Sequence, residues 1–118
     1  MKEKIEFCTS DHANDKFANE VRNMMPNEDV ICYMAELFKV FGDSTRTHIL
    51  MVLFESDACV CNICKVLNMT TSAVSHQLRI LRPNKLVKAK KVGREVVYSL
   101  ADEHVRLIFQ MAYEHVTE

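Results

Sequence analysis

Residues 70–100, TTSAVSHQLRILRPNKLVKAKKVGREVVYSL, decide the fold of this chain. Within SAVSHQLRIL the apolar residues recur at helical spacing on one face, at Val74, Leu78 and Leu81. The opposite face is polar and carries Ser72, His76 and Arg79. The next segment, LVKAKKV-GR-EVVYSL, consists of two alternating β-branched runs around Gly93 and predicts a β-hairpin. Few small folds place a hairpin directly after a helix of this kind.

Helices are expected on both sides of this segment. A short helix before Pro26 is predicted by the spacing of Phe17, Val21, Met24 and Met25. A second helix, capped by Asp29 and ended by Gly42, has an apolar face formed by Val30, Met34, Leu37, Phe38 and Phe41. A third, capped by Asp43 or Ser44, runs through HILMVLF, and a fourth runs through CNICKVLN to a break at NMTT. A last helix begins near Asp102.

The predicted order is that of a winged helix–turn–helix, mainly α with a β-hairpin wing. Residues 1–27 are expected to form an N-terminal arm, mobile over residues 1–11, and the short helix. Residues 28–118 are expected to form the DNA-binding and dimerisation domain. The 118 residues suffice for one modest core, and no apolar run could span a bilayer. The charged start MKEKIEFC does not resemble a signal peptide, so we expect a cytoplasmic protein.

The charge of the chain is distributed unevenly. Residues 58–94 contain eight Lys or Arg and no Asp or Glu, whereas the rest of the chain holds seven basic and sixteen acidic residues. An acid-free block of this kind indicates a surface that faces a polyanion, although a solvated basic face is the plainer reading. Because the block contains the predicted helix–turn–helix and hairpin, we expect it to bind double-stranded DNA.

Two sets of residues within the block would contact that DNA. The second helix of a helix–turn–helix offers short polar and basic side chains to base edges, here Thr71, Ser72, Ser75, His76 and Arg79. Basic residues then continue through the hairpin and would bind phosphates without regard to sequence: Arg82, Lys85, Lys88, Lys90, Lys91 and Arg94. Gly93 and Arg94 form the predicted wing tip, which would reach a minor groove or the backbone.

The last helix carries a polar pair at each end. Eleven residues at about 100° each return to nearly the same face, so His104 and His115 share one stripe with Ile108, Met111 and Glu118. The histidines would nevertheless lie about 16 Å apart along the axis, too far for one metal ion. Two antiparallel copies could join Asp102 and His104 of one chain to His115 and Glu118 of the other, with Ile108 and Met111 as a dimer seam. Two imidazoles and two carboxylates suit zinc. Asp102 could instead be only a helix cap.

A second cluster is CVCNIC, with Cys59, Cys61 and Cys64. Five cysteines in a chain of this kind favour thiolate or metal chemistry over disulfides. An irregular first helical turn would let Cys59 and Cys61 bind one ion, joined by Cys8 and His12 from the arm. Three sulfurs and one nitrogen favour cadmium, lead or zinc. Cys64 stays undecided, Cys32 is expected to be a buried small hydrophobe, and His48 a structural or surface residue. No open metal position stands beside a general base, so an enzyme is not expected.

These motifs together resemble the ArsR–SmtB family of metal-sensing repressors, over nearly the whole chain. The similarity lies in AELFKVFGDSTRTHIL, CVCNIC, TTSAVSHQLRILR, the basic hairpin and the final D-x-H-x10-H-x2-E, and it is strongest to the cadmium/lead/zinc-responsive branch. The resemblance implies a homodimer that binds the operators of metal-efflux or resistance genes and leaves them when metal binds.

The resemblance also implies two metal sites. Cys59 and Cys61 match the family's thiolate pair, and Cys8 and His12 match arm ligands supplied by the opposite subunit. His12 departs from the cadmium-sensing pattern, which has Cys there, and is similar to a zinc-sensing variant. Cys59, Cys61 and Cys64 also resemble an arsenite site. Asp102, His104, His115 and Glu118 match the zinc site of the last helix, whose second histidine would bond to backbone near Lys85. A thiol redox sensor through Cys59 and Cys61 is the remaining alternative.

Overall fold

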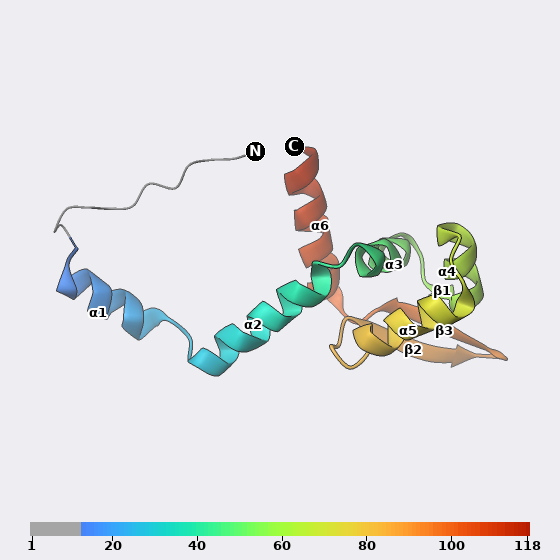
Figure 1. The fold of residues 1–118 in the computed structure, drawn as a ribbon, viewed down its shortest axis with the longest axis horizontal. Helices are drawn as coiled ribbons and strands as arrows, with labels where there is room; N and C mark the ends of the chain where they lie inside the picture. Colours follow the sequence, from blue (N-terminus) through green and yellow to red (C-terminus); the bar gives the residue numbers. More distant parts are fainter. Residues whose placement is uncertain (1–12) are drawn as a thin grey trace. The chain divides into compact units, whose positions relative to one another are not determined.

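The computed structural model of the protein describes residues 13–118. The predicted arm over residues 1–11, with Cys8, and the neighbouring His12 lie outside the described residues. The chain divides into two units, residues 1–33 and 34–118. In chain order the elements are α1 Asp15–Met24, α2 Glu28–Phe41, α3 Ser44–Glu55, β1 Ala58–Cys59, α4 Val60–Leu67, α5 Thr71–Leu81, β2 Val87–Val92, β3 Glu95–Leu100 and α6 Glu103–Thr117 (Figure 1).

Side-chain caps explain where most of these helices begin. The side chains of Asn14, Asp43, Thr70 and Asp102 accept backbone N–H groups at the starts of α1, α3, α5 and α6. The prediction that Asp29 caps α2 is wrong. The side chain of Asn27 accepts the N–H of Val30 at 3.0 Å, and Asp29 is already helical. Asp29 instead places a negative charge in the first turn, where the helix dipole favours it.

Helices α4 and α5 form the predicted helix–turn–helix. Asn68 ends α4 in the left-handed region, with φ 55° and ψ 50°, a conformation that Asn tolerates better than most residues. The N–H of Met69 bonds to the carbonyl of Cys64 at 3.0 Å and closes the turn, and Thr70 then caps α5. On α5 the predicted inner face is confirmed, because Val74, Leu78 and Leu81 are all buried.

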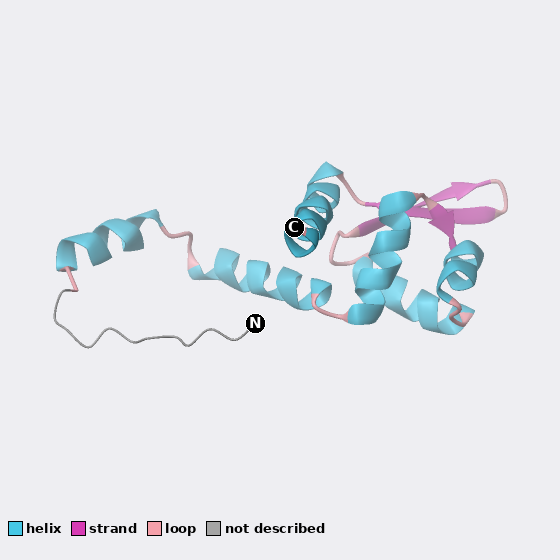
Figure 2. Ribbon diagram, turned by 90° about the horizontal axis from the view of Figure 1, so that it is seen from above, coloured by secondary structure: helices cyan, strands magenta, loops and turns pink. Residues whose placement is uncertain are grey.

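The predicted hairpin is confirmed and is part of a three-stranded antiparallel sheet in the order β1-β3-β2. Its register pairs Val87 with Leu100 and Val92 with Glu95, leaving a two-residue turn at 93–94. Gly93 has φ 63°, which this turn requires. The turn projects beyond the helices of the same unit in both views (Figures 1 and 2). Strand β1 was not predicted, since two residues carry no periodicity.

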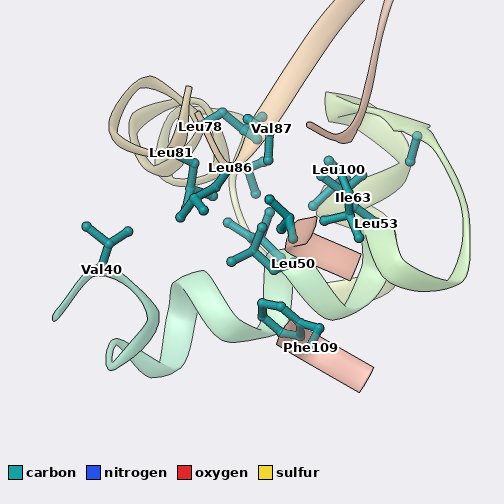
Figure 3. Packing of buried hydrophobic residues seen from close by; sticks show 14 residues of the cluster. Val40, Leu50, Leu53, Ile63, Leu78, Leu81, Leu86, Val87, Leu100 and Phe109 are labelled. Carbon is teal, nitrogen blue, oxygen red and sulfur yellow. The ribbon is translucent and has the colours of Figure 1, made fainter. Parts of the chain in front are cut away.

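The core lies between α3, α4, α5, α6 and the sheet (Figure 3). Ile49, Leu50 and Leu53 of α3 are fully buried and lie at its centre. Burying each such side chain contributes roughly 1.5–3 kcal/mol. Phe109 of α6 packs edge-on against Phe41, with ring centroids 5.4 Å apart. The remaining buried apolar residues are Val40, Ala58, Ile63, Val74, Leu78, Leu81, Leu86, Val87, Leu100 and Val105.

Helix α2 differs from its prediction in how much of its apolar face is covered. Leu37 and Phe41 pack against the core, but Met34 is 49% and Phe38 61% exposed. Val30, in the first unit, is 42% exposed. The prediction that Cys32 is buried is wrong, because this thiol is exposed. Within residues 13–118, no helix combines the length and apolar character needed to cross a membrane.

Candidate nucleic-acid interface and metal sites

The outer face of α5 is polar, as predicted. Thr71, Ser72, His76 and Arg79 are exposed, and Ser75 is half-buried. Because the inner face of α5 is packed into the core, these side chains are held on a rigid element with a fixed outward direction. The first backbone N–H groups of α5 point out of its N-terminal end. A phosphate oxygen placed there can accept hydrogen bonds from them.

Two contacts join α5 to the neighbouring helices α3 and α4, and the sequence did not reveal either. The Nε of Arg46 on α3 donates to Oε1 of Gln77 at 3.0 Å. The thiol of Cys64 on α4 lies 4.0 Å from the hydroxyl of Thr71, as a weak donor. Gln77 lies on the flank of α5 away from Ser72 and Arg79, so Arg46 supports the helix rather than its outer surface.

The basic residues of the wing, defined as β2, β3 and their turn, are free for an anionic partner. Lys88, Lys90, Lys91 and Arg94 are exposed, as is Arg82 before the wing. Along β2 the side chains alternate, so Lys88 and Lys90 share one face and Lys91 lies on the other. Within residues 13–118 the one ion pair is Asp102 with His104, and none of these cations has a carboxylate partner.

The cysteine cluster spans the junction of the sheet and α4. Cys59 is half-buried in β1 and is also the cap position of α4, with φ −80° and ψ 166°. This differs from the predicted irregular helical turn, because pairing with β3 holds the residue extended. Cys59 pairs with Val97, which in turn pairs with Lys90, so the three lie in one row across the sheet. Cys61 is exposed in the first turn of α4, and Cys64 is half-buried one turn later.

The two ends of α6 carry the other predicted ligands. Asp102 accepts the N–H of Val105 at 3.0 Å and lies 3.7 Å from Nδ1 of His104. The predicted cap role of Asp102 is therefore present, together with an exposed imidazole beside it. His115 and Glu118 are exposed at the far end. Between the ends, Ile108 is 38% and Met111 64% exposed.

A single chain does not assemble a metal site from the residues described. Within 13–118, no three His, Cys, Asp or Glu side chains approach closely enough to hold an ion. The predicted partners Cys8 and His12 lie outside this range. His48, predicted to be structural or on the surface, is exposed and its Nδ1 lies 2.7 Å from the carbonyl of Ser44.

A polar recognition helix, a supporting helix and a basic wing together define a DNA-binding protein of the winged helix–turn–helix class. A homodimeric winged helix–turn–helix DNA-binding domain from Mycobacterium bovis has the same fold, with a TM-score of 0.71 at 22% identity over 92% of each chain. The profile of the bacterial regulatory proteins of the arsR family matches residues 43–89.

Two curated relatives extend the match. The chain is 35% identical to a transcriptional repressor SmtB homolog of Synechocystis, over 98% of this chain and 88% of that protein. It is 38% identical to a cadmium resistance transcriptional regulatory protein CadC homolog of Staphylococcus aureus, over 72% of this chain and 71% of that one. The protein therefore belongs to the ArsR–SmtB family of transcriptional repressors, as the sequence resemblance predicted. Family and fold are those of regulators rather than enzymes, which agrees with the prediction.

Proposed function

We propose that this protein is a metal-responsive repressor that binds operator DNA as a homodimer and is released by cadmium, lead or zinc. The observation that carries the proposal is the arrangement of α6. Its four candidate ligands are split between its two ends, and exposed apolar residues separate them.

The dimer follows from exposed apolar surface. Ile108 and Met111 of α6 and Phe38 of α2 are all more than a third exposed in the single chain. Residues 34–118 leave a further hollow of about 210 Å³ between α2 and α6, lined by Phe38, Ile108 and Ala112 among others. A second copy packed antiparallel along α6 would cover this surface and place the ligands of opposite ends together.

The α6 site would then form twice in each dimer. Asp102 and His104 of one protomer would meet His115 and Glu118 of its partner, giving two imidazoles and two carboxylates. This donor set fits zinc. The short distance between Asp102 and His104 supports their acting as one half-site, because Asp102 caps α6 and His104 lies in its first turn.

The thiolate site would use Cys59 and Cys61, with Cys8 and His12 of the arm completing it. Sulfur donors favour the softer ions, cadmium and lead, and the cadmium resistance relative is consistent with this choice. The alternative is arsenite bound by Cys59, Cys61 and Cys64. The contact between Cys64 and Thr71 favours it, since a ligand on this sulfur would act beside the recognition helix.

Both sites connect physically to DNA-contacting elements. Cys59 is paired with β3, so a change in its position is transmitted to the wing. Arg106 donates to the carbonyl of Phe54 at 2.9 Å and joins α6 to α3, which holds α5 through Arg46. Metal need only bind better to the dimer conformation that fits DNA poorly, and it then shifts the population off the operator. From this role it follows that the protein acts in the cytoplasm and controls metal-efflux or resistance genes.

The test is operator-fragment binding by fluorescence anisotropy, with zinc, cadmium, lead and arsenite titrated under reducing conditions. Cys61→Ser and His115→Ala separate the two sites. Cys32→Ser and His48→Ala are matched controls, because both residues are exposed and belong to neither site. Release lost only in Cys61→Ser assigns sensing to the thiolate site, and release lost only in His115→Ala assigns it to α6. Release by an oxidant and by no metal contradicts the proposal and supports a thiol redox sensor.

A further inference from the structure

A pocket between α3 and α4 lies outside all the surfaces assigned so far. Its cavity volume is about 460 Å³, and Met51, Val52, Val66 and Leu67 supply most of its wall. Small-molecule sites have volumes of about 300–1,000 Å³ and are mostly apolar with a few polar groups. None of the lining residues belongs to the proposed DNA surface or metal sites, and one of them, Thr47, also lines the hollow of the proposed dimer surface.

The polar groups of this pocket offer hydrogen-bond acceptors. The hydroxyl of Thr47 already donates to the carbonyls of Phe41 and Asp43, and the hydroxyl of Ser56 donates to that of Asp57. His48 donates from Nδ1 to the carbonyl of Ser44, because a carbonyl can only accept, so Nε2 of the neutral ring is left as an acceptor.

The charge of the pocket has one sign. Glu55 is exposed, lines the pocket and makes no ion pair among the described residues. It is the last residue of α3, where the helix dipole presents its negative end. Arg106 binds the carbonyl of Phe54 nearby but is not part of the lining, which contains no Lys or Arg.

We propose that this pocket binds a small amphipathic organic ammonium ion, with its apolar body between α3 and α4 and its N–H groups directed to Glu55. An apolar wall, acceptors without free donors, and an unpaired carboxylate together select this class of ligand. A carboxylate ligand would meet Glu55 with a like charge, and a neutral ligand would gain no attraction from it.

The binding test uses three probes with one apolar body: 1-naphthylmethylammonium, 1-naphthylmethanol and 1-naphthoate. They are titrated into the full-length ¹⁵N-labelled protein and followed by amide chemical shifts. The ammonium ion should shift the amides of Met51, Val52 and Val66 and bind about threefold to fivefold more tightly than the alcohol, as expected for an ion pair at an exposed carboxylate. Equal binding of all three probes, or shifts confined to other parts of the chain, overturns the proposal.

Two substitutions and one control sharpen the test. Glu55→Gln should weaken ammonium binding about threefold to fivefold while leaving the alcohol unchanged, since only the charge is removed. Glu103→Gln, an exposed carboxylate on α6, should change neither. Val66→Trp fills the pocket from a position that is 66% exposed, so it should fold normally and bind none of the probes. Ammonium binding that survives both Glu55→Gln and Val66→Trp contradicts this site. The experiment contains no metal and no DNA, so its outcome is independent of the proposed repressor function.

Discussion

The thiol of Cys64 on α4 lies 4.0 Å from the hydroxyl of Thr71, the first residue of the recognition helix. This contact links the cysteine cluster directly to the surface that we propose to face DNA. A thiol is a weak donor, so the contact itself contributes little to stability. A ligand on the same sulfur would have a larger effect, because it would add bulk and remove the donor beside the start of α5.

Cys64→Ser therefore distinguishes the two thiolate hypotheses. Serine keeps a donor in place of the thiol, and the contact that changes is weak and contributes less than about 1 kcal/mol, so operator affinity should stay within about fivefold of the original. Anisotropy titrations should show release by cadmium retained, because the cadmium set uses Cys59 and Cys61. Release by arsenite should be lost if Cys64 is its third ligand. If cadmium no longer releases Cys64→Ser from the operator, Cys64 takes part in cadmium binding. This result would contradict the proposed cadmium set, which does not include Cys64.

Asp102 combines two roles that a pair of substitutions can separate. Its carboxylate caps α6 by accepting the N–H of Val105, and it lies beside His104. Asn is also a good cap, so Asp102→Asn should change the free energy of unfolding by less than about 0.5 kcal/mol, whereas Asp102→Ala should cost about 1 kcal/mol. Urea unfolding of the metal-free protein measures both.

The same two variants test the metal proposal. Both variants lack the Asp102 carboxylate, so both should bind zinc at the α6 site more weakly. A competition assay with a chromophoric chelator measures this affinity. If Asp102→Asn binds zinc as tightly as the original protein, Asp102 is a cap and not a ligand.

Arg46 and Gln77 are expected to act as a unit that supports the recognition helix. Their hydrogen bond, 3.0 Å long and partly buried, joins α3 to α5. Arg46→Met keeps the aliphatic stem and removes the donor, and Gln77→Leu removes the acceptor. Urea unfolding of the two single variants and the double variant should give a coupling energy of about 1 kcal/mol. A coupling energy near zero would mean that the pair does not hold α5.

The sequence predicted those parts of the fold whose signals are local. Val74, Leu78 and Leu81 repeat at helical spacing, and Gly93 marks the hairpin turn, so α5 and the wing were both predicted. Strand β1 could not be, because its two residues are extended only through pairing with Val97 and Tyr98, some forty residues away. Long-range pairing of this kind has no periodicity in one sequence.

The candidate sites also combine features that local spacing predicts with features that only the packing of the helices shows. The stripe on α6 is visible from spacing alone, and the structure confirms that Ile108 and Met111 are exposed on it. The support from Arg46 and the pocket beside Glu55 depend on which helices pack together, so spacing did not reveal them. Cys32 was predicted to be buried from its residue type, but the structure leaves its thiol exposed.

Met111 tests the proposed dimer most directly. It is 64% exposed at the middle of the α6 stripe, so an arginine there should leave the fold of the single chain unchanged and place two like charges at the centre of the antiparallel seam. Met111→Arg should therefore sediment as a monomer at concentrations where the original protein is a dimer, with an unchanged far-ultraviolet circular dichroism spectrum. Its operator affinity should fall at least about a hundredfold, because a monomer contacts one half-site instead of two. Gln110→Arg adds the same charge on another face of the exposed helix and should remain dimeric. If Met111→Arg is still dimeric, the seam does not run along this stripe, and His104 and His115 of opposite chains are not brought together.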